Sequence, residues 1–260
     1  YIDLLRNNEL SNFRTLVKEI TVNSLMLRYL NGNESNKNAP NENYARELLE
    51  LFTIGKGIQA GPGDYTNYTE EDIKEIARAL TGWTISGANW PYDPINGVPL
   101  GQFVYDSSRH DQGIKRILAR YFQASQGQTD GIVLFDMLAR HPSTAKHMAG
   151  KLCRRFVGAN PSNALIDNVA SVFQQSWQAS DQIKQVMQVI LQSAEFKTGW
   201  GTAMKRPALS AVSALRATGA DFTLKPDNNG SIYTPTEEFR GRLQAAGHRL
   251  FYWPAPNGYP

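Results

Sequence analysis

The sequence has 260 residues, a formal net charge of +3 and 41% hydrophobic residues. This length suits one large domain or two small ones, and so small a positive excess is untypical of a dedicated nucleic-acid-binding protein. The single cysteine, Cys153, excludes an intramolecular disulfide and a cysteine-rich zinc site. No apolar run is long enough to predict a transmembrane helix.

Helical spacing of apolar residues dominates the N-terminal half. Residues 13–30 predict two short helices divided near Thr21, and residues 40–54 predict a longer one. Thr69 precedes three acidic residues in a close variant of a capping box, which predicts a helix that ends at Gly82.

Evidence for strands is limited to two short runs. Residues 83–85 and 103–105 are rich in aromatic and β-branched side chains, and they flank a loop with several prolines and glycines at 86–101. They predict one small hairpin. A connection of this length inside a compact domain is usually functional or mobile.

Helical spacing returns in the C-terminal half. Residues 142–157 carry one apolar stripe, begin with Pro142 in the favoured first-turn position and stop at Gly158. Residues 181–192 show the same spacing, with Ser180 expected to cap the first turn. Further helices are predicted at residues 161–177, 207–218 and 235–246.

Together these segments predict a mostly α protein of eight to ten helices with a small β-hairpin or long loop insertion. No internal repeat and no sharp change of composition divides the chain. Residues 1–260 are therefore predicted to form one helical domain.

Several longer motifs follow one another along the chain. They are APNENYARELLELFT (39–53), YTEED (68–72), ARALTGW (77–83), HDQGIK (110–115), HPSTA (141–145), KLCRRFV (151–157) and PNGYP (256–260). In this order they resemble the bacterial family called domain of unknown function 1800, over nearly the whole chain. The resemblance implies an exported protein, periplasmic or secreted, and it implies no settled activity.

Two departures from the family pattern affect what is expected. Family members usually carry a further N-terminal helical segment and continue past the PNGYP motif, so the chain is expected to be a fragment. In addition, Ala119 and Arg120 stand where the family tends to have Leu-Gly, which leaves the tightness of that turn open.

A charged cluster lies on the predicted 40–54 helix. Glu47 and Glu50 are three residues apart and so share one neighbourhood, where they could bind a divalent cation or divide acid and base roles. Alternatively, Arg46 forms ordinary i, i+4 pairs with Glu42 and Glu50, or serves as a binding residue. Glu47 lies at the apolar boundary and is the member expected to be buried and specifically paired.

His110 and Asp111 are the leading catalytic candidates. An imidazole beside a carboxylate suits proton transfer or metal binding, and Lys115 follows four residues later as a candidate binding residue. The structural alternative is a turn in which Asp111 caps the next element.

A basic stripe occupies the predicted 142–157 helix. His141 precedes its first turn as a possible cap next to amides that could hold an anion. Lys151, Arg154 and Arg155, together with His147, could bind phosphate, an acidic polymer or the carboxylates of a partner. A solvated helix face explains the same pattern.

Aromatic residues and the cysteine complete the candidates. Trp90 and Tyr92 lie in the long loop and are expected to be accessible for binding, whereas Trp83 is expected in the core. Cys153 is interpreted as a small apolar core residue, although its basic neighbours could lower the pKa of its thiol.

No motif specifies a cofactor or a metal, and the common nucleotide-binding, serine-hydrolase and zinc-protease signatures are absent. The leading hypothesis is therefore a binding or assembly module for a cell-envelope polymer or a partner protein, not for nucleic acid. The alternative is a metal-assisted or acid/base hydrolase that uses Glu47, Glu50, His110 and Asp111.

Overall fold

The computed structural model describes residues 1–56, 68–87, 94–95, 97–199, 201, 205–220 and 235–249. Its contacts divide the chain into two compact units, Tyr1–Gly199 and Trp200–Pro260.

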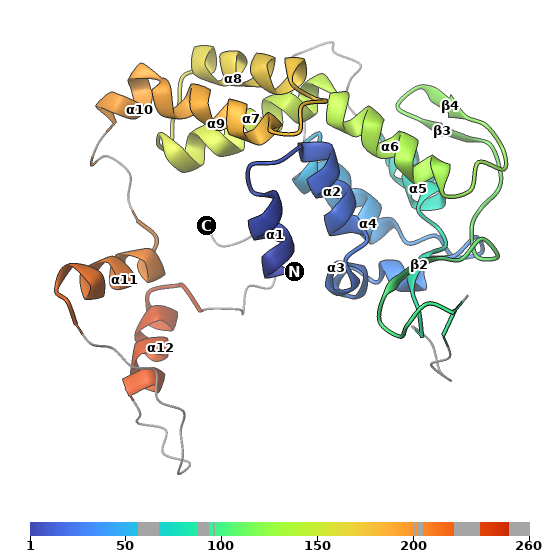
Figure 1. Ribbon diagram of the computed structural model, residues 1–260, viewed down its shortest axis with the longest axis horizontal. Helices are drawn as coiled ribbons and strands as arrows, with labels where there is room; N and C mark the ends of the chain where they lie inside the picture. The colour runs from blue at the N-terminus through green and yellow to red at the C-terminus, as the bar shows by residue number, and fades with distance from the viewer. Residues whose placement is uncertain are drawn as a thin grey trace. The chain divides into compact units, whose positions relative to one another are not determined.

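Helices make up most of the first unit (Figure 1). Their bounds are α1 (Ile2–Asn8), α2 (Phe13–Thr21), α3 (Ser24–Tyr29), α4 (Glu42–Glu47), α5 (Glu70–Ala79), α6 (Thr129–Arg140), α7 (Pro142–Phe156), α8 (Asn163–Gln175), α9 (Gln182–Gln192) and α10 (Ala194–Thr198). A 3₁₀ turn at Gly32–Glu34 and a π-helix at Leu48–Phe52 complete them. The predicted mostly α fold is confirmed.

The second unit contains α11 (Pro207–Ala217) and α12 (Pro235–Ala245) in its described part. The described residues thus hold twelve α-helices, against the eight to ten predicted. The unpredicted helices are α1, α6 and α10, of which α1 and α10 are only seven and five residues long. Helices this short show too few turns for apolar spacing to reveal them.

Helix α6 was missed for a different reason. It begins without a side-chain cap and carries a glycine, Gly131, in its first turn, and both features argue against a helix in a sequence. The glycine is required by packing, because a Cβ at this position would lie 2.3 Å from Cζ2 of Trp83.

Two small antiparallel sheets lie in the first unit. The predicted hairpin is confirmed as β1 (Trp83–Ile85) paired with β2 (Phe103–Tyr105). A second hairpin, β3 (Lys115–Ile117) with β4 (Arg120–Phe122), was not predicted.

The turn of the second hairpin explains that omission. Leu118 and Ala119 both have positive φ, 48° and 63°, as in the two-residue turn that normally requires asparagine or glycine. Residues with a Cβ are strained in this region, so the sequence holds no hairpin signal. The turn is tight even without the glycine typical of the family.

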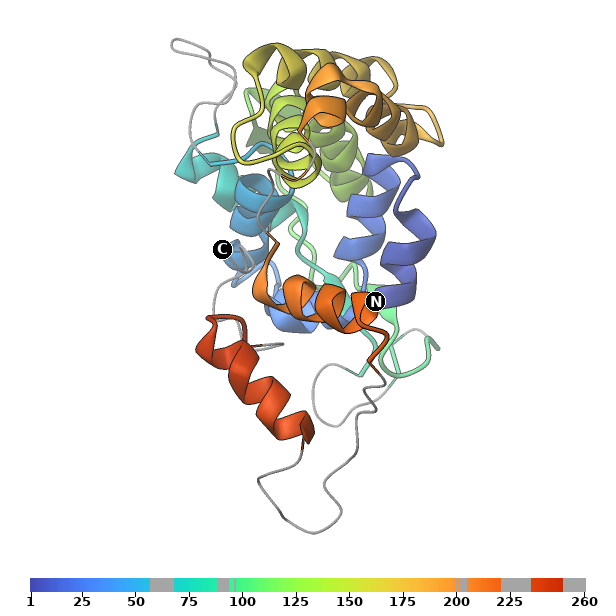
Figure 2. The ribbon, with the colours of Figure 1, turned by 90° about the vertical axis from the view of Figure 1, so that its left-hand side faces the viewer.

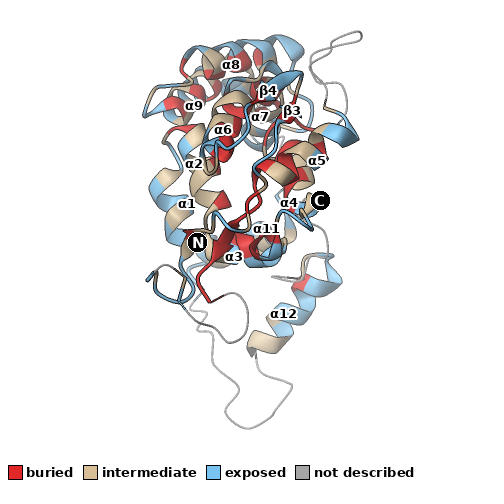
Figure 3. Ribbon diagram, turned by 90° about the vertical axis from the view of Figure 1, so that its right-hand side faces the viewer, coloured by how far each residue is buried: buried red, intermediate tan, exposed pale blue. Residues whose placement is uncertain are grey.

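The core of the first unit lies between its helices. Helix α7 packs on α8, α8 on α9, and α4 on α5, while α1 and α2 lie side by side (Figure 2). Buried positions recur along single faces of α5, α6, α8 and α9 (Figure 3). The apolar stripes that the sequence showed therefore face one another, which is the expected basis of stability in such a fold.

Helix starts were predicted with mixed success. Thr69 and Asp72 form the expected capping box at α5, whereas the cap of α8, Ser162, was not predicted. The cap predicted for Ser180 is wrong, because α9 begins after Asp181 with no side-chain cap. The 40–54 helix is confirmed, but its second half winds as the π-helix, a form often found at functional sites.

Among the described residues, no helix combines the length and apolar character needed to cross a bilayer.

Candidate functional site

Helix α5 organises the candidate site through its carboxylates. Asp72 Oδ1 accepts the backbone N–H of Leu118 at 2.7 Å, and Glu75 Oε2 accepts that of Arg116 at 2.8 Å. The two acids stand one helical turn apart and bind amides two residues apart along the second hairpin. The two carboxylates of α5 therefore accept N–H groups along the open edge of the second hairpin, which a neighbouring strand would otherwise do.

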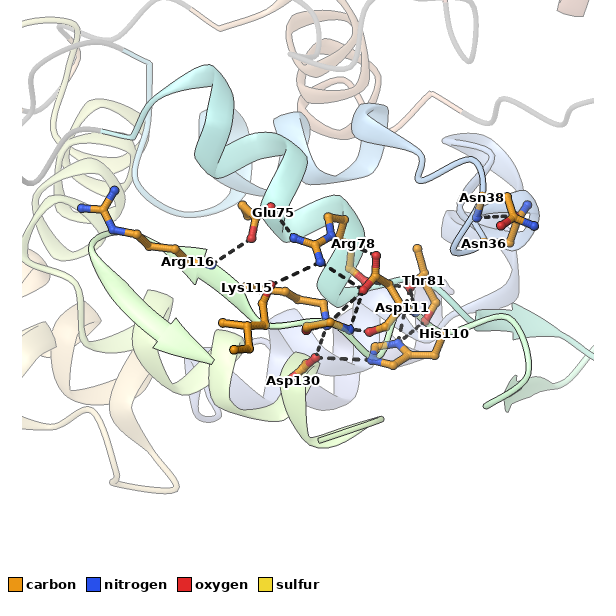
Figure 4. A network of polar contacts seen from close by, with 12 residues as sticks. Asn36, Asn38, Glu75, Arg78, Thr81, His110, Asp111, Lys115, Arg116 and Asp130 are labelled. Carbon is orange, nitrogen blue, oxygen red and sulfur yellow. Dashed lines mark hydrogen bonds and ion pairs between the residues drawn. The ribbon is translucent and has the colours of Figure 1, made fainter. Parts of the chain in front are cut away.

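Arg78, at the other end of α5, connects three segments (Figure 4). Its guanidinium donates to Glu75 at 2.6 Å and forms a two-pronged contact with Asp111 at 2.9 and 3.1 Å. This contact lowers the pKa of Asp111 and raises that of Arg78. Gly113 lets the guanidinium approach closely, because a Cβ at this position would lie 2.7 Å from Nη2 and displace it.

A groove lies between α5 and the second hairpin. Its volume is about 740 Å³, and its lining includes Tyr68, Tyr121, Ile114 and Arg116 in addition to the acids and Arg78 of α5. Tyr121 and Ile114 are 65% and 58% exposed. The side chains at its base are held by the bonds described above, so the groove is preformed.

Below this groove lies a buried cluster of His110, Lys115 and Asp130 (Figure 4). Lys115 Nζ donates to Asp130 Oδ2 at 2.8 Å and to the carbonyls of Asp111 and Gly113 at 2.6 and 3.0 Å. His110 Nε2 lies 3.3 Å from the same Asp130 oxygen. The Lys115 and Asp130 side chains are each 1% exposed, so the ion pair is desolvated.

The tautomer of His110 follows from its other contacts. Its Nδ1 lies 2.7 Å from the carbonyl oxygen of Thr81, which can only accept, so Nδ1 carries the proton. The Thr81 hydroxyl donates instead to the carbonyl of Arg78 and accepts from the Asp111 N–H. Nε2 is therefore the ring nitrogen that faces Asp130.

The predicted pairing of His110 with Asp111 is not the one observed. Although adjacent in sequence, His110 points inward to Asp130 while Asp111 points to Arg78 on the outer side. Lys115, predicted as a binding residue, is a buried partner of Asp130 and is also among the residues that line the groove.

The four residues of the hydrolase hypothesis do not converge. Arg46 contacts Glu50 at 3.6 Å and also binds Glu70, the first residue of α5, at 2.7 and 2.9 Å. Arg78, which holds Asp111, stands eight residues further along the same helix, or about 12 Å at 1.5 Å per residue. The Glu50 and Asp111 neighbourhoods therefore lie near opposite ends of α5.

The acidic residues of α4 behave largely as the structural alternative predicted. Arg46 also contacts Glu42, at 3.9 Å, in the expected i, i+4 pattern. Glu47 is half-buried, and burial together with the Glu50 charge raises its pKa. It forms no hydrogen bond or ion pair with another described residue, so the specific pairing predicted for it is not observed.

The basic stripe of α7 is only partly free to bind a ligand. Lys151 Nζ and His147 Nε2 approach the Leu51 carbonyl at 3.0 and 3.3 Å, where they satisfy the end of the π-helix. Desolvation lowers the pKa of both groups. Arg154 and Arg155 are exposed and form no ion pair within the described ranges.

Of the remaining candidates, two have structural roles and two lie outside the described residues. His141 caps α7, accepting the N–H of Ser143 through its ring nitrogen at 3.2 Å. Cys153 is buried, and burial raises the pKa of its thiol to about 11, which confirms the core interpretation. Trp90 and Tyr92 lie outside the described residues.

Over the part of the chain that is described, no group of three or more histidine, cysteine or acidic side chains could hold a metal ion.

A comparison with protein families decides the relationship of this chain. The family model described as Protein of unknown function (DUF1800) matches residues 1–260. The chain belongs to this family. No curated protein and no solved structure matches this DUF1800 chain.

The sequence did not point to several of the residues that build the candidate site. Asp130, Arg78 and Glu75 were not candidates, and Asp72 was considered only as part of a helix cap. Arg78 lies in the quoted ARALTGW motif, which was a usable signal. Asp130 had none, because it is twenty residues from His110 and lies in the first turn of a helix without a cap.

Proposed function

We propose that this DUF1800 chain is a binding module of the bacterial cell envelope, and that the groove between α5 and the second hairpin holds a segment of a polymer. The observation that carries the proposal is the preformed groove with exposed Tyr121 on one wall and a base of fixed polar side chains. Aromatic faces combined with a few placed polar groups are typical of small-molecule and oligomer sites.

The charge of the groove favours an uncharged ligand. Of its acidic residues, Glu75 pairs with Arg78 and Asp72 accepts from the backbone, and Arg116 adds an exposed positive charge. A strongly charged polymer would meet as much repulsion as attraction. The hydroxyl groups of a sugar can donate to the remaining lone pairs of the groove's carboxylates and accept from its remaining N–H groups. A neutral oligosaccharide therefore fits the groove.

The dimensions support a short extended segment. The lining runs from Thr69 at the start of α5 to Arg78 near its end, nine residue steps or about 14 Å. A groove of this length would contact one short stretch of a polymer.

The test is calorimetric titration with neutral oligosaccharides, with an acidic polysaccharide and with a peptide library. We expect binding to a neutral glycan and at least a tenfold weaker affinity for Tyr121→Ala, equivalent to about 1.4 kcal/mol. Tyr29→Ala is the matched control, since Tyr29 is 59% exposed on α3 and lies outside the groove.

Equal affinities for both variants would reject the groove as the site. Preferential binding of the acidic polymer or of a peptide would reject the neutral glycan. The hydrolase alternative gains no support from the geometry, because its four residues lie in two separate neighbourhoods.

A further inference from the structure

The Lys115–Asp130 pair has the arrangement of two groups poised to condense. Nζ lies 2.8 Å from Oδ2, and since a carbon–oxygen bond is about 1.2 Å, Nζ is at most about 4 Å from the Asp130 carboxyl carbon. A contact of this length approaches the separation of reactants in a near-attack arrangement.

Burial makes the charged form of this pair costly. Both side chains are 1% exposed, and Ile117, Phe122 and Leu134 of the neighbouring elements belong to the surrounding hydrophobic core. Desolvation of two opposite charges is only partly recovered by their attraction. A neutral product would relieve this cost.

The hydrogen bonds around the pair also suit a nucleophilic amine. Two carbonyl oxygens, of Asp111 and Gly113, accept from Nζ. They can hold the two protons of a neutral amine, which leaves its lone pair directed to the carboxyl group. Asp130 Oδ1 is buried and has no hydrogen-bond partner among the described residues, so one carboxyl oxygen is not held by any donor.

His110 supplies the proton path. Its Nδ1 proton is fixed on Thr81, and its Nε2 lies 3.3 Å from Oδ2, the oxygen that leaves. An imidazole in this place can exchange a proton with Oδ2 and so help that oxygen to leave as water.

We propose that Lys115 and Asp130 form an intramolecular isopeptide bond. The bond between Nζ and the carboxyl carbon forms, and the bond from that carbon to Oδ2 breaks. Two of the three ammonium protons leave with Oδ2 as water, the third stays on the amide nitrogen, and Oδ1 becomes the amide oxygen. No oxidant or other reactant is needed.

The test is mass spectrometry of the purified full chain after denaturation. The linked chain is lighter than its sequence by one water molecule. Trypsin cleaves after Arg109, Arg116, Arg120 and Arg140 but not after a modified Lys115. We therefore expect peptide 110–116 joined to peptide 121–140, with fragment ions that place the link at Lys115 and Asp130.

Controls come from the same molecule and from variants. Lys146 and Asp167 form a similar contact at 3.1 Å but are 40% and 57% exposed, so they should stay unlinked. Lys115→Arg and Asp130→Ala should show the full sequence mass, and His110→Gln should contain a smaller linked fraction. This experiment does not involve the groove or its ligand.

A wild-type chain with the full sequence mass and separate peptides 110–115 and 121–140 would overturn the proposal. It would show that the pair is a buried ion pair only. Because this result comes from the wild-type protein, it holds even if the variants fail to fold.

Discussion

Asp72 should contribute far more to stability than its neighbour Glu71. Its Oδ2 accepts from the N–H and the hydroxyl of Thr69, both at 2.8 Å, and its Oδ1 accepts from Leu118 N at 2.7 Å. Loss of a helix cap costs about 1 kcal/mol, and loss of a backbone bond to a charged acceptor costs roughly 1.5–3 kcal/mol. Asp72→Ala should therefore lower the free energy of unfolding by about 3 kcal/mol.

Glu71→Ala is the matched control. Glu71 is in the same helical turn, but its side chain is 72% exposed and only approaches Lys74 at 3.6 Å. Such a change should stay within about 0.5 kcal/mol. Urea denaturation measures both values. For a unit of this size the Asp72 variant should melt roughly 6–12 °C lower.

Hydrogen exchange locates the effect. In Asp72→Ala the Leu118 amide should lose protection, while amides of α7, α8 and α9 keep theirs once the global change is subtracted. Equal destabilisation by both variants, or an unchanged Leu118 amide, would refute the assigned role of Asp72.

Three further predictions concern the network beneath the groove and the core. Lys115→Met should destabilise the first unit by about 3–5 kcal/mol in urea denaturation, because it leaves Asp130 buried without a countercharge; a loss under 1 kcal/mol would contradict this. Arg78 lowers the pKa of Asp111, so this interaction stabilises the fold above the ordinary aspartate pKa and is lost as pH falls through the folded-state value. Arg78→Gln should flatten that acid dependence between about pH 5 and pH 2, and an unchanged pH profile would argue against it. Cys153, with a pKa of about 11, should react with thiol reagents at neutral pH only after unfolding, and rapid labelling of the native protein would show that it is accessible.

Much of the fold could be predicted because local signals and packing agree. The apolar stripe of α7 begins at a proline and its last turn is followed by a glycine, and the structure places the helix there. The β3–β4 hairpin could not be predicted, since its turn uses Leu118 and Ala119 in a conformation those residues disfavour. There the contacts to Asp72 and Glu75, distant in sequence, outweigh the local preference.

The candidate site was predicted in part. His110 and Lys115 were recognised as unusual residues, but their partner was sought next to them in the sequence. Neighbouring side chains in a turn point in different directions, so His110 and Asp111 serve separate networks. Asp130 reaches the site because α6 packs against β1. The spacing of residues in the sequence does not predict this contact.

The close fit of Gly131 under Trp83 bears on how relatives of this chain can diverge. The indole and the glycine fix the distance between the first hairpin and the beginning of α6, independently of the chain that connects β1 to β2. Insertions or deletions in that connection can therefore accumulate without displacing Asp130. In an alignment of homologues, we expect variable length between positions 86 and 101 alongside an invariant glycine at 131.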